Sequence, residues 1–232
     1  MNKEIFWIAS FPKSGNTLVR SILSSLFFSS DGNFSFDKLV NIDQFERTDR
    51  IEKNKKIFGN NINKLNNTPI LYKYLSKLQT KKALGLKEDF LFLKTHCGLF
   101  EIGGNPFTNK DSTRGIIYVI RDPRDVCISW SKHLNISLDK SIENMINEYA
   151  VLPWTEPNPK KIIFNEKNRP RSFYSSWEKH VLSWTSNNWN VPIKIIKFED
   201  LVYDKINVIK DIIHFFESNF KFEFNNIEKK ID

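Results

Sequence analysis

The sequence contains four short apolar runs, and each run is followed at once by polar, glycine or proline residues. Unbroken apolar runs of this length are typical of strands that are buried on both faces of a parallel sheet. The segments between the runs carry apolar residues at helical spacing, so strands and helices alternate along the chain. This order predicts an α/β fold with three layers, α/β/α, around a central parallel sheet. The predicted strands are Ile5–Phe11, Phe90–Thr95, Gly115–Ile120 and Pro192–Phe198.

The remaining segments divide into predicted helices and predicted loops. Ser30–Leu86 is rich in lysine and asparagine and is expected to hold short helices, such as Ile70–Leu78. Parallel sheets of this kind bind ligands at the carboxyl ends of their strands, so polar residues at those ends are the candidates for a site. The other helices are predicted at Thr17–Phe28, through Val126, Ile128 and Trp130, at Phe173–Trp189 and at Val202–Phe216; the loops are Cys97–Thr113 and Leu152–Pro170.

The composition fits one domain, residues 1–232, with a basic surface. The 232 residues are 40% hydrophobic, which is enough for a sizeable core, and the net charge of +8 favours anionic partners. A lysine-rich composition alone also gives this net positive charge, so the charge by itself does not indicate an anionic partner. No nucleic-acid motif is present, and no run approaches the ~18 apolar residues of a membrane helix.

The cysteine content and the N-terminus predict a cytoplasmic protein. Cys97 and Cys127 are too few for a disulfide framework, which indicates free thiols in a reducing compartment. The first apolar run, Ile5–Phe11, is too short for the core of a signal peptide.

The segment that joins the first strand to the first helix has the features of a phosphate-binding loop. It reads Ser-Phe-Pro-Lys-Ser-Gly-Asn-Thr over Ser10–Thr17. Gly15 permits a tight turn, and the N–H groups at the start of the following helix form an anion site. Lys13 adds a positive charge, while Ser14 and Thr17 add hydroxyl donors. The motif differs from Walker A, in which the lysine follows the last glycine.

Two further motifs lie at strand ends. Arg121 ends the third strand, and Ser129 follows eight residues later, so a turn and the start of a helix bring the two together. Arginine offers a rigid fork for phosphate oxygens, and serine adds a neutral donor. Asp122 and Asp125 suit the N-terminus of that helix, which is their simpler explanation.

Lys94-Thr-His96 ends the second strand and supplies a candidate general base. The ordinary pKa of histidine lies near neutral pH, which suits proton abstraction by His96. A polar pocket residue is the alternative interpretation of His96. The other histidines are weaker candidates: His133 follows Ser129, His180 suits structural packing, and His214 lies on the last helix.

These motifs, together with Phe198-Glu-Asp-Leu201 after the fourth strand, resemble in their order those of the PAPS-dependent sulfotransferases (PAPS is 3′-phosphoadenosine-5′-phosphosulfate). The resemblance implies a P-loop NTPase-like fold and transfer of a sulfuryl group from PAPS to a hydroxyl or amine, with release of PAP and without a metal. It also implies the roles of individual residues. Lys13, Lys94 and His96 would be catalytic, and the donor would contact Lys13, Ser14, Gly15, Asn16, Thr17, Arg121, Ser129 and Phe198.

The sequence departs from the family pattern at three places. Leu18 stands where many members carry a tryptophan that packs on adenine, and Phe198 replaces a tyrosine. The family's C-terminal Arg-Lys-Gly loop, which closes over the 3′-phosphate, has no counterpart. Lys229 and Lys230 would be a poor substitute for it. We therefore expect a single sulfotransferase domain that lacks the nucleotide-covering loop, and three explanations stay open: a naturally short chain, a truncated chain, or weak donor binding.

Two other functions remain open at this stage. A P-loop kinase shares the fold and the anion site, and a degenerate domain that only binds nucleotides or polyanions would explain the absent loop. The acceptor is expected to be a small molecule or a carbohydrate, bound by the irregular segments, and the sequence does not predict the oligomeric state. Four aromatic residues would line an apolar acceptor pocket or belong to the core: Phe107, Tyr149, Trp154 and Phe164.

Overall fold

The chain forms a central five-stranded sheet whose strands all run parallel. The computed structural model describes residues 4–158 and 163–224. The strand order is β2-β3-β1-β6-β9, so the first strand lies in the middle and is buried along its whole length. This arrangement confirms the predicted α/β/α fold with a parallel sheet. The strands are β1 (Ile5–Ser10), β2 (Ile42–Gln44), β3 (Leu91–Thr95), β6 (Thr113–Ile120) and β9 (Ile193–Lys197).

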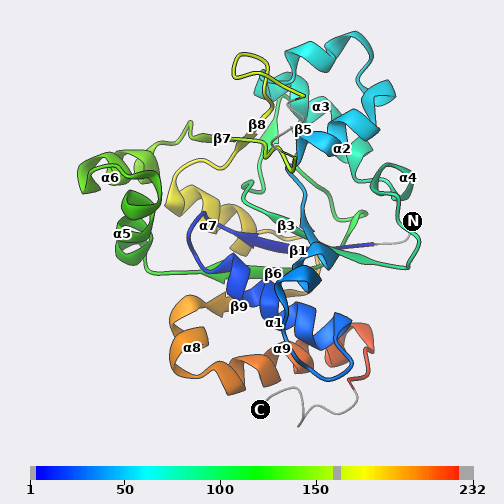
Figure 1. Ribbon diagram of the computed structural model, residues 1–232, viewed down its shortest axis with the longest axis vertical. Helices are drawn as coiled ribbons and strands as arrows, with labels where there is room; N and C mark the ends of the chain where they lie inside the picture. The colour runs from blue at the N-terminus through cyan, green and yellow to red at the C-terminus, as the bar shows by residue number, and fades with distance from the viewer. Residues whose placement is uncertain (1–3, 159–162, 225–232) are drawn as a thin grey trace.

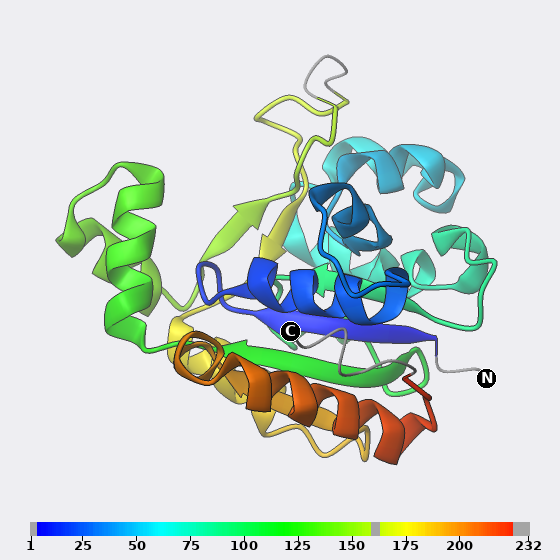
Figure 2. The same ribbon diagram turned by 60° about the horizontal axis from the view of Figure 1, so that its bottom comes forward.

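Helices cover both faces of this sheet, as Figures 1 and 2 show. Successive side chains of a strand point to opposite faces. Phe6 and Ile8 therefore pack in the core cluster beneath α1 and α9, whereas Trp7 and Ala9 pack in the cluster on the α3 and α7 side. The helices are α1 (Asn16–Phe28), α2 (Thr48–Lys53), α3 (Thr68–Leu78), α4 (Lys81–Leu84), α7 (Trp177–Thr185), α8 (Phe198–Tyr203) and α9 (Lys205–Phe220).

Phenylalanine rings fill much of the core beneath α1 and α9. The ring of Phe6 stacks on Phe92 at 5.3 Å between centroids and meets Phe216 and Phe220 edge-on. The guanidinium of Arg114 lies 5.5 Å from the Phe6 centroid, at the rim of this cluster. Aromatic pairs in such offset and edge-on geometries add to the stabilisation from burial. Many of the chain's phenylalanines thus hold α1 and α9 against the sheet.

A second group of elements stands at the carboxyl edge of the sheet, where Figure 1 shows α5 and α6 projecting beyond the strand ends. A separate small core joins α5, α6 and the hairpin of β7 and β8 through residues such as Phe11, Trp130, Met145 and Tyr174. The elements of this group are α5 (Pro123–Leu134), α6 (Leu138–Ile146), β7 (Val151–Pro153) and β8 (Arg171–Phe173). Residues of α5, β7 and β8 line the cavity described below.

Several predicted elements differ from the observed ones. The predicted helix Phe173–Trp189 is wrong at both ends. Phe173 belongs to β8, and α7 begins only after Ser176, whose side chain accepts a hydrogen bond from the N–H of Lys179. The predicted helix Val202–Phe216 is two helices that meet at Asp204. The stretch Ser30–Leu86 contains β2 as well as its short helices. Short helices were expected in this stretch, and η1 (Phe36–Asn41), η2 (Lys55–Ile57) and η3 (Gly59–Lys64) are among them. The short strands β4 (Glu101–Ile102) and β5 (Asn105–Pro106) were not predicted.

The four aromatic residues that were expected either to line an acceptor pocket or to belong to the core fall into two groups. Phe107, Trp154 and Phe164 are buried in the core on the α3 and α7 side, whereas the Tyr149 side chain is 84% exposed. Lys229, Lys230 and part of the predicted loop, residues 159–162, lie outside the described residues. Within the described ranges, no helix combines the length and the apolar character needed to cross a lipid bilayer.

Candidate active site

The loop between β1 and α1 is shaped by two residues with left-handed backbone conformations. Lys13 has φ of 68° and Gly15 has φ of 96°. Gly15 also lies against the ring of Phe198, where a Cβ atom would stand 2.3 Å from the ring carbon Cδ2. Only glycine satisfies both the backbone conformation and this close approach. The loop therefore turns sharply and delivers the chain into the N-terminus of α1.

Side chains of this loop tie it to β1 and to the interior. The Asn16 amide donates to the backbone carbonyl of Ile8 at 3.0 Å and to the Ser10 hydroxyl at 3.2 Å. Ser14 is buried, and its hydroxyl has no hydrogen-bond partner among the described residues. Thr17 is exposed in the first turn of α1. The first N–H groups of a helix have no partner within the helix, so this turn presents free donors.

Arg121 comes from the end of β6 and lies beside the loop. Its guanidinium donates to the Lys13 carbonyl at 3.3 Å and is centred 4.2 Å from the centroid of the Phe198 ring. The carboxylate of Asp125 is 3.9 Å from the same guanidinium. Ser129 is half-buried on α5, four residues after Asp125 and thus on the same helix face. The structure thereby gathers the loop, Arg121 and Phe198 into one group.

The structure confirms the simpler explanation of Asp122, that it caps the N-terminus of the helix after β6. It is the N-cap of α5, and its side chain accepts from the Arg124 N–H at 2.8 Å. Its own N–H donates to the Glu199 carboxylate at 3.0 Å, which ties the start of α5 to α8. The second residue of Phe198-Glu-Asp-Leu201 thus helps to hold Arg121 in place.

His96 is held by the end of β1. Its Nδ1 lies 2.8 Å from the carbonyl oxygen of Ser10, which can only accept a hydrogen bond. Nδ1 therefore carries the proton, and Nε2 is left as the acceptor of the neutral ring. Burial lowers the pKa of His96 well below its usual value, the neighbouring Lys94 lowers it further, and the bond to Ser10 opposes this in part. The ring is thus a neutral imidazole at neutral pH.

Lys94 has an unusual environment for a lysine. Its ammonium donates to Gln44 Oε1 at 3.3 Å. Burial lowers the pKa of Lys94 to about 8, with Glu46 acting in the opposite direction and Arg20 adding to the decrease. The side chain is therefore charged at neutral pH but loses its proton in a mildly alkaline range.

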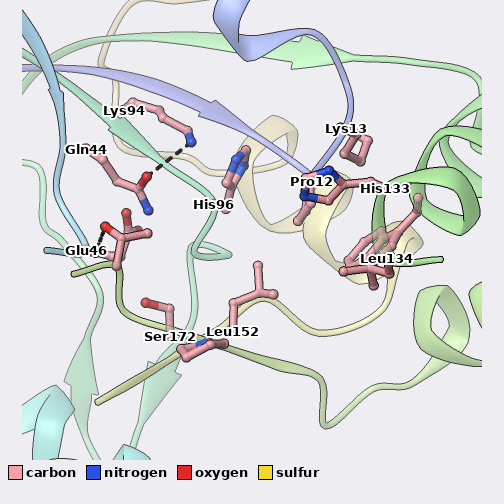
Figure 3. Close-up of a pocket in the computed structure, with 13 residues that line it drawn as sticks. Pro12, Lys13, Gln44, Glu46, Lys94, His96, His133, Leu134, Leu152 and Ser172 are labelled. Atoms are coloured by element: carbon pink, nitrogen blue, oxygen red, sulfur yellow. Dashed lines mark hydrogen bonds between the residues drawn. The ribbon is translucent and has the colours of Figure 1, made fainter. Parts of the chain in front are cut away.

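These residues line one cavity of about 290 Å³ at the carboxyl edge of the sheet. In Figure 3, Lys94, Gln44 and Glu46 lie on one side of the cavity, Lys13, His133 and Leu134 on the other, and His96 between them. The catalytic residues predicted from the sequence, Lys13, Lys94 and His96, thus come together from separate segments. The remaining wall residues are Pro12, Trp130, Leu152, Pro153, Thr155 and Ser172. Among the described residues, no three His, Cys, Asp or Glu side chains are grouped so as to hold a metal ion.

Sequence reasoning missed several residues around this cavity. Gln44 and Glu46 come from β2 and the residues after it, inside a stretch that was expected to be helical. Ser172 comes from β8, just after the predicted loop Leu152–Pro170. The only sequence signal of β2 is the apolar Ile42 followed by polar residues. A strand this short is not recognisable from its hydrophobic pattern.

His180 supports the segment that carries His96. Its Nδ1 is 2.8 Å from the Tyr118 hydroxyl, and its Nε2 is 3.2 Å from the carbonyl oxygen of His96. Because a carbonyl only accepts, Nε2 donates and Nδ1 accepts from the tyrosine. The side chain is fully buried, and burial lowers the pKa of His180 to about 3. The prediction of structural packing for His180 is therefore confirmed, and the residue links β6 to the loop after β3.

Solved structures share this fold. A mouse sulfotransferase, SULT7A1, in complex with PAP has a TM-score of 0.52 at 16% identity; the match covers 100% of this chain and 63% of the other. Retinol dehydratase in complex with androsterone and PAP has a TM-score of 0.52 at 17% identity, with 93% of this chain and 60% of the other covered. The sheet and its helices thus have the P-loop NTPase-like architecture of these proteins.

The sequence comparison identifies the family. The family model for the sulfotransferase domain matches residues 3–231, so the chain belongs to the sulfotransferase family. Luciferin sulfotransferase of Photinus pyralis is 26% identical over 221 residues, which are 90% of this chain and 50% of that protein. Sulfotransferase 2A6 of Mus musculus is 26% identical over 141 residues, 59% of this chain and 42% of that protein. The chain thus spans at most about half the length of these curated relatives.

The neutral, buried His180 makes the stability of the fold depend on pH. Its pKa is about 3 in the folded state, against a usual value near ~6.5 in an unfolded chain. The unfolded state therefore binds more protons between these values, and stability is full above pH ~6.5 and falls on acidification. His96 contributes in the same direction. Between pH ~6.5 and ~5, we expect each buried histidine to lower the free energy of unfolding by up to ~1.4 kcal/mol per pH unit.

Urea unfolding of His180→Gln between these pH values measures this effect. The variant keeps an amide that can donate and accept, and its slope of unfolding free energy against pH should be smaller by about one proton. His214→Gln, on the exposed side of α9, is the matched control and should keep the wild-type slope. Equal slopes in all three proteins would contradict a neutral, buried His180.

Proposed function

We propose that this chain is a PAPS-dependent sulfotransferase that modifies a hydroxyl or amine of an acceptor and releases PAP. The observation that carries this proposal is the meeting of Lys13, Lys94 and His96 in one cavity beside the N-terminus of α1. Membership of the sulfotransferase family and a fold shared with PAP-bound structures support it. The shorter span of the chain relative to its relatives leaves the activity to be tested directly.

The residues present fit a 5′-phosphosulfate and a 3′-phosphate. The N–H groups of Gly15, Asn16 and Thr17 at the start of α1, with the ammonium of Lys13, form the anion site for the 5′ end. The buried Ser14 hydroxyl, which has no partner among the described residues, is available to donate there. We assign the 3′-phosphate to Arg121 and Ser129, which offer a fork of donors and a neutral hydroxyl.

Two residues of this set contribute differently from the expectation based on the family. The Asn16 side chain is engaged with Ile8 and Ser10, so its contribution would come from its backbone N–H. The Phe198 ring lies against Gly15, and the Arg121 guanidinium lies over the same ring. We therefore propose that Phe198 orients Arg121 and the loop, in addition to any contact with the nucleotide.

The mechanism follows from the protonation states in the cavity. PAPS supplies the sulfuryl group when bound, and PAP carries away the bonding electrons of the broken bond. His96 Nε2 is an unprotonated acceptor and takes the proton of the acceptor hydroxyl or amine. Lys13 and Lys94 place two ammonium groups against the charge that develops on the transferred group and on the leaving phosphate. Kinases use Mg²⁺ to neutralise the charge on the phosphate groups, and here the lysine and arginine side chains of the chain would neutralise that charge.

The two alternative functions are less well supported. A P-loop kinase requires a lysine after the last glycine of the loop, whereas Lys13 precedes Gly15, and the family match is to sulfotransferases. A degenerate binding domain would not need a neutral histidine and a lysine of lowered pKa in the same cavity. Perturbed titrating groups that share a cavity are typical of catalytic sites.

The acceptor is proposed to be a small molecule. The relatives include a luciferin sulfotransferase and a retinol dehydratase whose structure contains androsterone, and the cavity here has apolar walls from Trp130, Leu134 and Leu152. A carbohydrate remains the second candidate. A cytoplasmic location remains a prediction, supported by Cys97 and Cys127, both of which are buried and unpaired.

Ligand-induced stabilisation tests the donor site. PAP at about 100 times its Kd should stabilise the fold by ~2.7 kcal/mol, which is visible as a rise in Tm. Arg121→Ala should lose most of this rise, because each charge-assisted phosphate contact is worth ~1.5–3 kcal/mol. Arg124→Ala, which removes an exposed guanidinium bound to Asp122, is the control and should keep it. A rise with ATP and Mg²⁺ alone would favour the kinase, and no rise with either ligand would contradict the proposed donor site.

The lowered pKa of Lys94 predicts that the pH profile of activity has an alkaline limb, in which activity falls as the pH rises. With an alcohol acceptor that does not titrate, kcat/KM should fall above pH ~8 as Lys94 loses its proton. On the acid side His96 stays neutral through pH ~6.5, because its pKa is lowered. Lys94→Arg keeps the charge and should move the alkaline limb upward, since arginine stays protonated beyond pH ~12. Lys132→Arg, on the exposed side of α5, is the control. An alkaline limb that is the same in wild type and Lys94→Arg would contradict this assignment.

A further inference from the structure

Gln44 is a cavity residue that contacts the proposed catalytic Lys94. It ends β2 and is paired with Lys94 of β3 in the parallel sheet. Ile42 and Phe92, two residues earlier on the same two strands, pack in the core cluster beneath α1 and α9. Because side chains alternate along a strand, Gln44 and Lys94 share that face of the sheet. The register of the two strands therefore brings the amide and the ammonium together at the carboxyl edge.

Hydrogen bonds on both sides fix the backbone of Gln44. The guanidinium of Arg20, on α1, donates to the carbonyl oxygen of Ile42 at 2.6 Å. The N–H of Phe45 donates to the carbonyl oxygen of Lys94 at 2.9 Å, which continues the strand pairing past Gln44. These bonds tie β2 to the helix of the donor site and to β3. The Gln44 side chain therefore extends from a fixed point on the cavity wall.

The contact between the two side chains has a defined direction. The Lys94 ammonium donates to Gln44 Oε1 at 3.3 Å, on the side of the cavity opposite Lys13 in Figure 3. Since an ammonium only donates, the amide oxygen faces Lys94 and the amide NH2 group points away from it. Among the described residues, Gln44 Oε1 is the one hydrogen-bond acceptor of this ammonium. An ammonium has three N–H donors, so two of them remain for a ligand.

The neutral character of this partner has an electrostatic consequence. An amide oxygen stabilises an ammonium through one hydrogen bond and leaves its net charge in place. A carboxylate at the same position would form an ion pair and would cancel much of the field that the ammonium exerts on a ligand. Glutamine therefore holds the Lys94 side chain and keeps its full positive charge available for an anionic group in the cavity.

The other charged groups around Lys94 come from several elements. Glu46, after β2, acts to raise the pKa of Lys94, whereas Arg20 on α1 acts to lower it. His96, just after β3, is neutral because burial lowers its pKa, and Lys13 lies across the cavity. These groups act on Lys94 through space, and the hydrogen bond to the amide adds a direct contact that fixes where the ammonium lies.

We propose that Gln44 is a positioning residue, which holds the Lys94 ammonium against the transferred sulfuryl group and leaves its positive charge unneutralised. This inference rests on the proposed sulfotransferase function. It adds to the site a residue that lies outside the phosphate loop, outside Lys94-Thr-His96 and outside the motif that begins at Arg121. A residue that only fills the cavity wall is the competing interpretation, and the experiment below separates the two.

The charge of Lys94 can be titrated without knowledge of the acceptor. In protein labelled with [ε-13C]lysine, the NMR shift of each Cε follows the protonation of its ammonium, and the Lys94 signal is the one absent from Lys94→Arg. Wild type should titrate near pH 8 at Lys94, against ~10.4 for ordinary lysines. Gln44→Glu should raise this midpoint by about one pH unit or more, because it places an opposite charge beside the ammonium. Gln44→Met keeps the length but removes the acceptor, and should lower the midpoint by about half a unit.

A control variant and the two nucleotides complete the experiment. Asn60→Asp adds the same charge as Gln44→Glu at an exposed position of η3 and should leave the Lys94 midpoint unchanged. In wild type, PAPS should raise the midpoint further than PAP does, because the sulfuryl group carries a negative charge toward Lys94. Both substitutions of Gln44 should reduce this difference, since the ammonium is then either paired with a carboxylate or no longer held.

Each outcome has a distinct meaning. Equal midpoints in wild type and both Gln44 variants would overturn the proposal, and so would shifts in the same direction, because Gln44 would then not control the charge of Lys94. Opposite shifts without a further response of wild type to PAPS would overturn the role at the sulfuryl group. Failure of wild type to bind either nucleotide would instead reject the proposed function. The titration of the ligand-free variants would still decide whether Gln44 holds Lys94, so the two failures remain distinguishable.

Discussion

The parallel pairing of β1 with β3 is the constraint on which the candidate site depends. Their register places Ala9 opposite Thr95, so the next residues, Ser10 at the end of β1 and His96 just after β3, lie side by side. The Ser10 carbonyl can then accept the Nδ1 proton of His96 at 2.8 Å. One backbone hydrogen bond thereby orients the ring and fixes its tautomer. Because the phosphate loop continues directly from Ser10, the same pairing also sets the distance between the anion site and the candidate base.

Burial at the carboxyl edge of the sheet shifts the pKa values of the titratable groups in the cavity. The same desolvation that keeps His96 neutral lowers the pKa of Lys94 to about 8. In such low-dielectric surroundings, electrostatic contacts with a ligand are worth more than they would be in water. Lys94 thus lies on the same side of the cavity as Glu46, and Lys13 lies on the opposite side of His96 from both.

The sequence predicted the parts of this arrangement that depend on local pattern. The strands around Phe6, Phe92 and Ile117 were recognisable because runs buried on both faces are continuously apolar. The loop from Lys13 to Thr17 was recognisable because its glycine and its charge have a direct physical purpose. Family resemblance, rather than spacing, indicated the roles of His96 and Arg121. Those roles remain proposals.

The parts that were missed depend on tertiary contacts. β2 has only three residues, and the edge of β3 stabilises it, so its own sequence carries little signal. Glu46 was not predicted as a site residue for the same reason. The helix Phe173–Trp189 was extended too far because the apolar Phe173 pairs with Val151 in a hairpin, a contact that helical spacing does not reveal.

The most direct test of the account is the turnover of His96→Asn, measured together with its binding of PAP. Asparagine can still donate to the Ser10 carbonyl, so the loop and the donor site should persist and the PAP-induced rise in Tm should match that of wild type. Loss of the base should lower the rate of sulfated product formation by ~10²–10⁴. Unimpaired turnover, with PAP bound as in wild type, would contradict the central claim that His96 takes the acceptor proton.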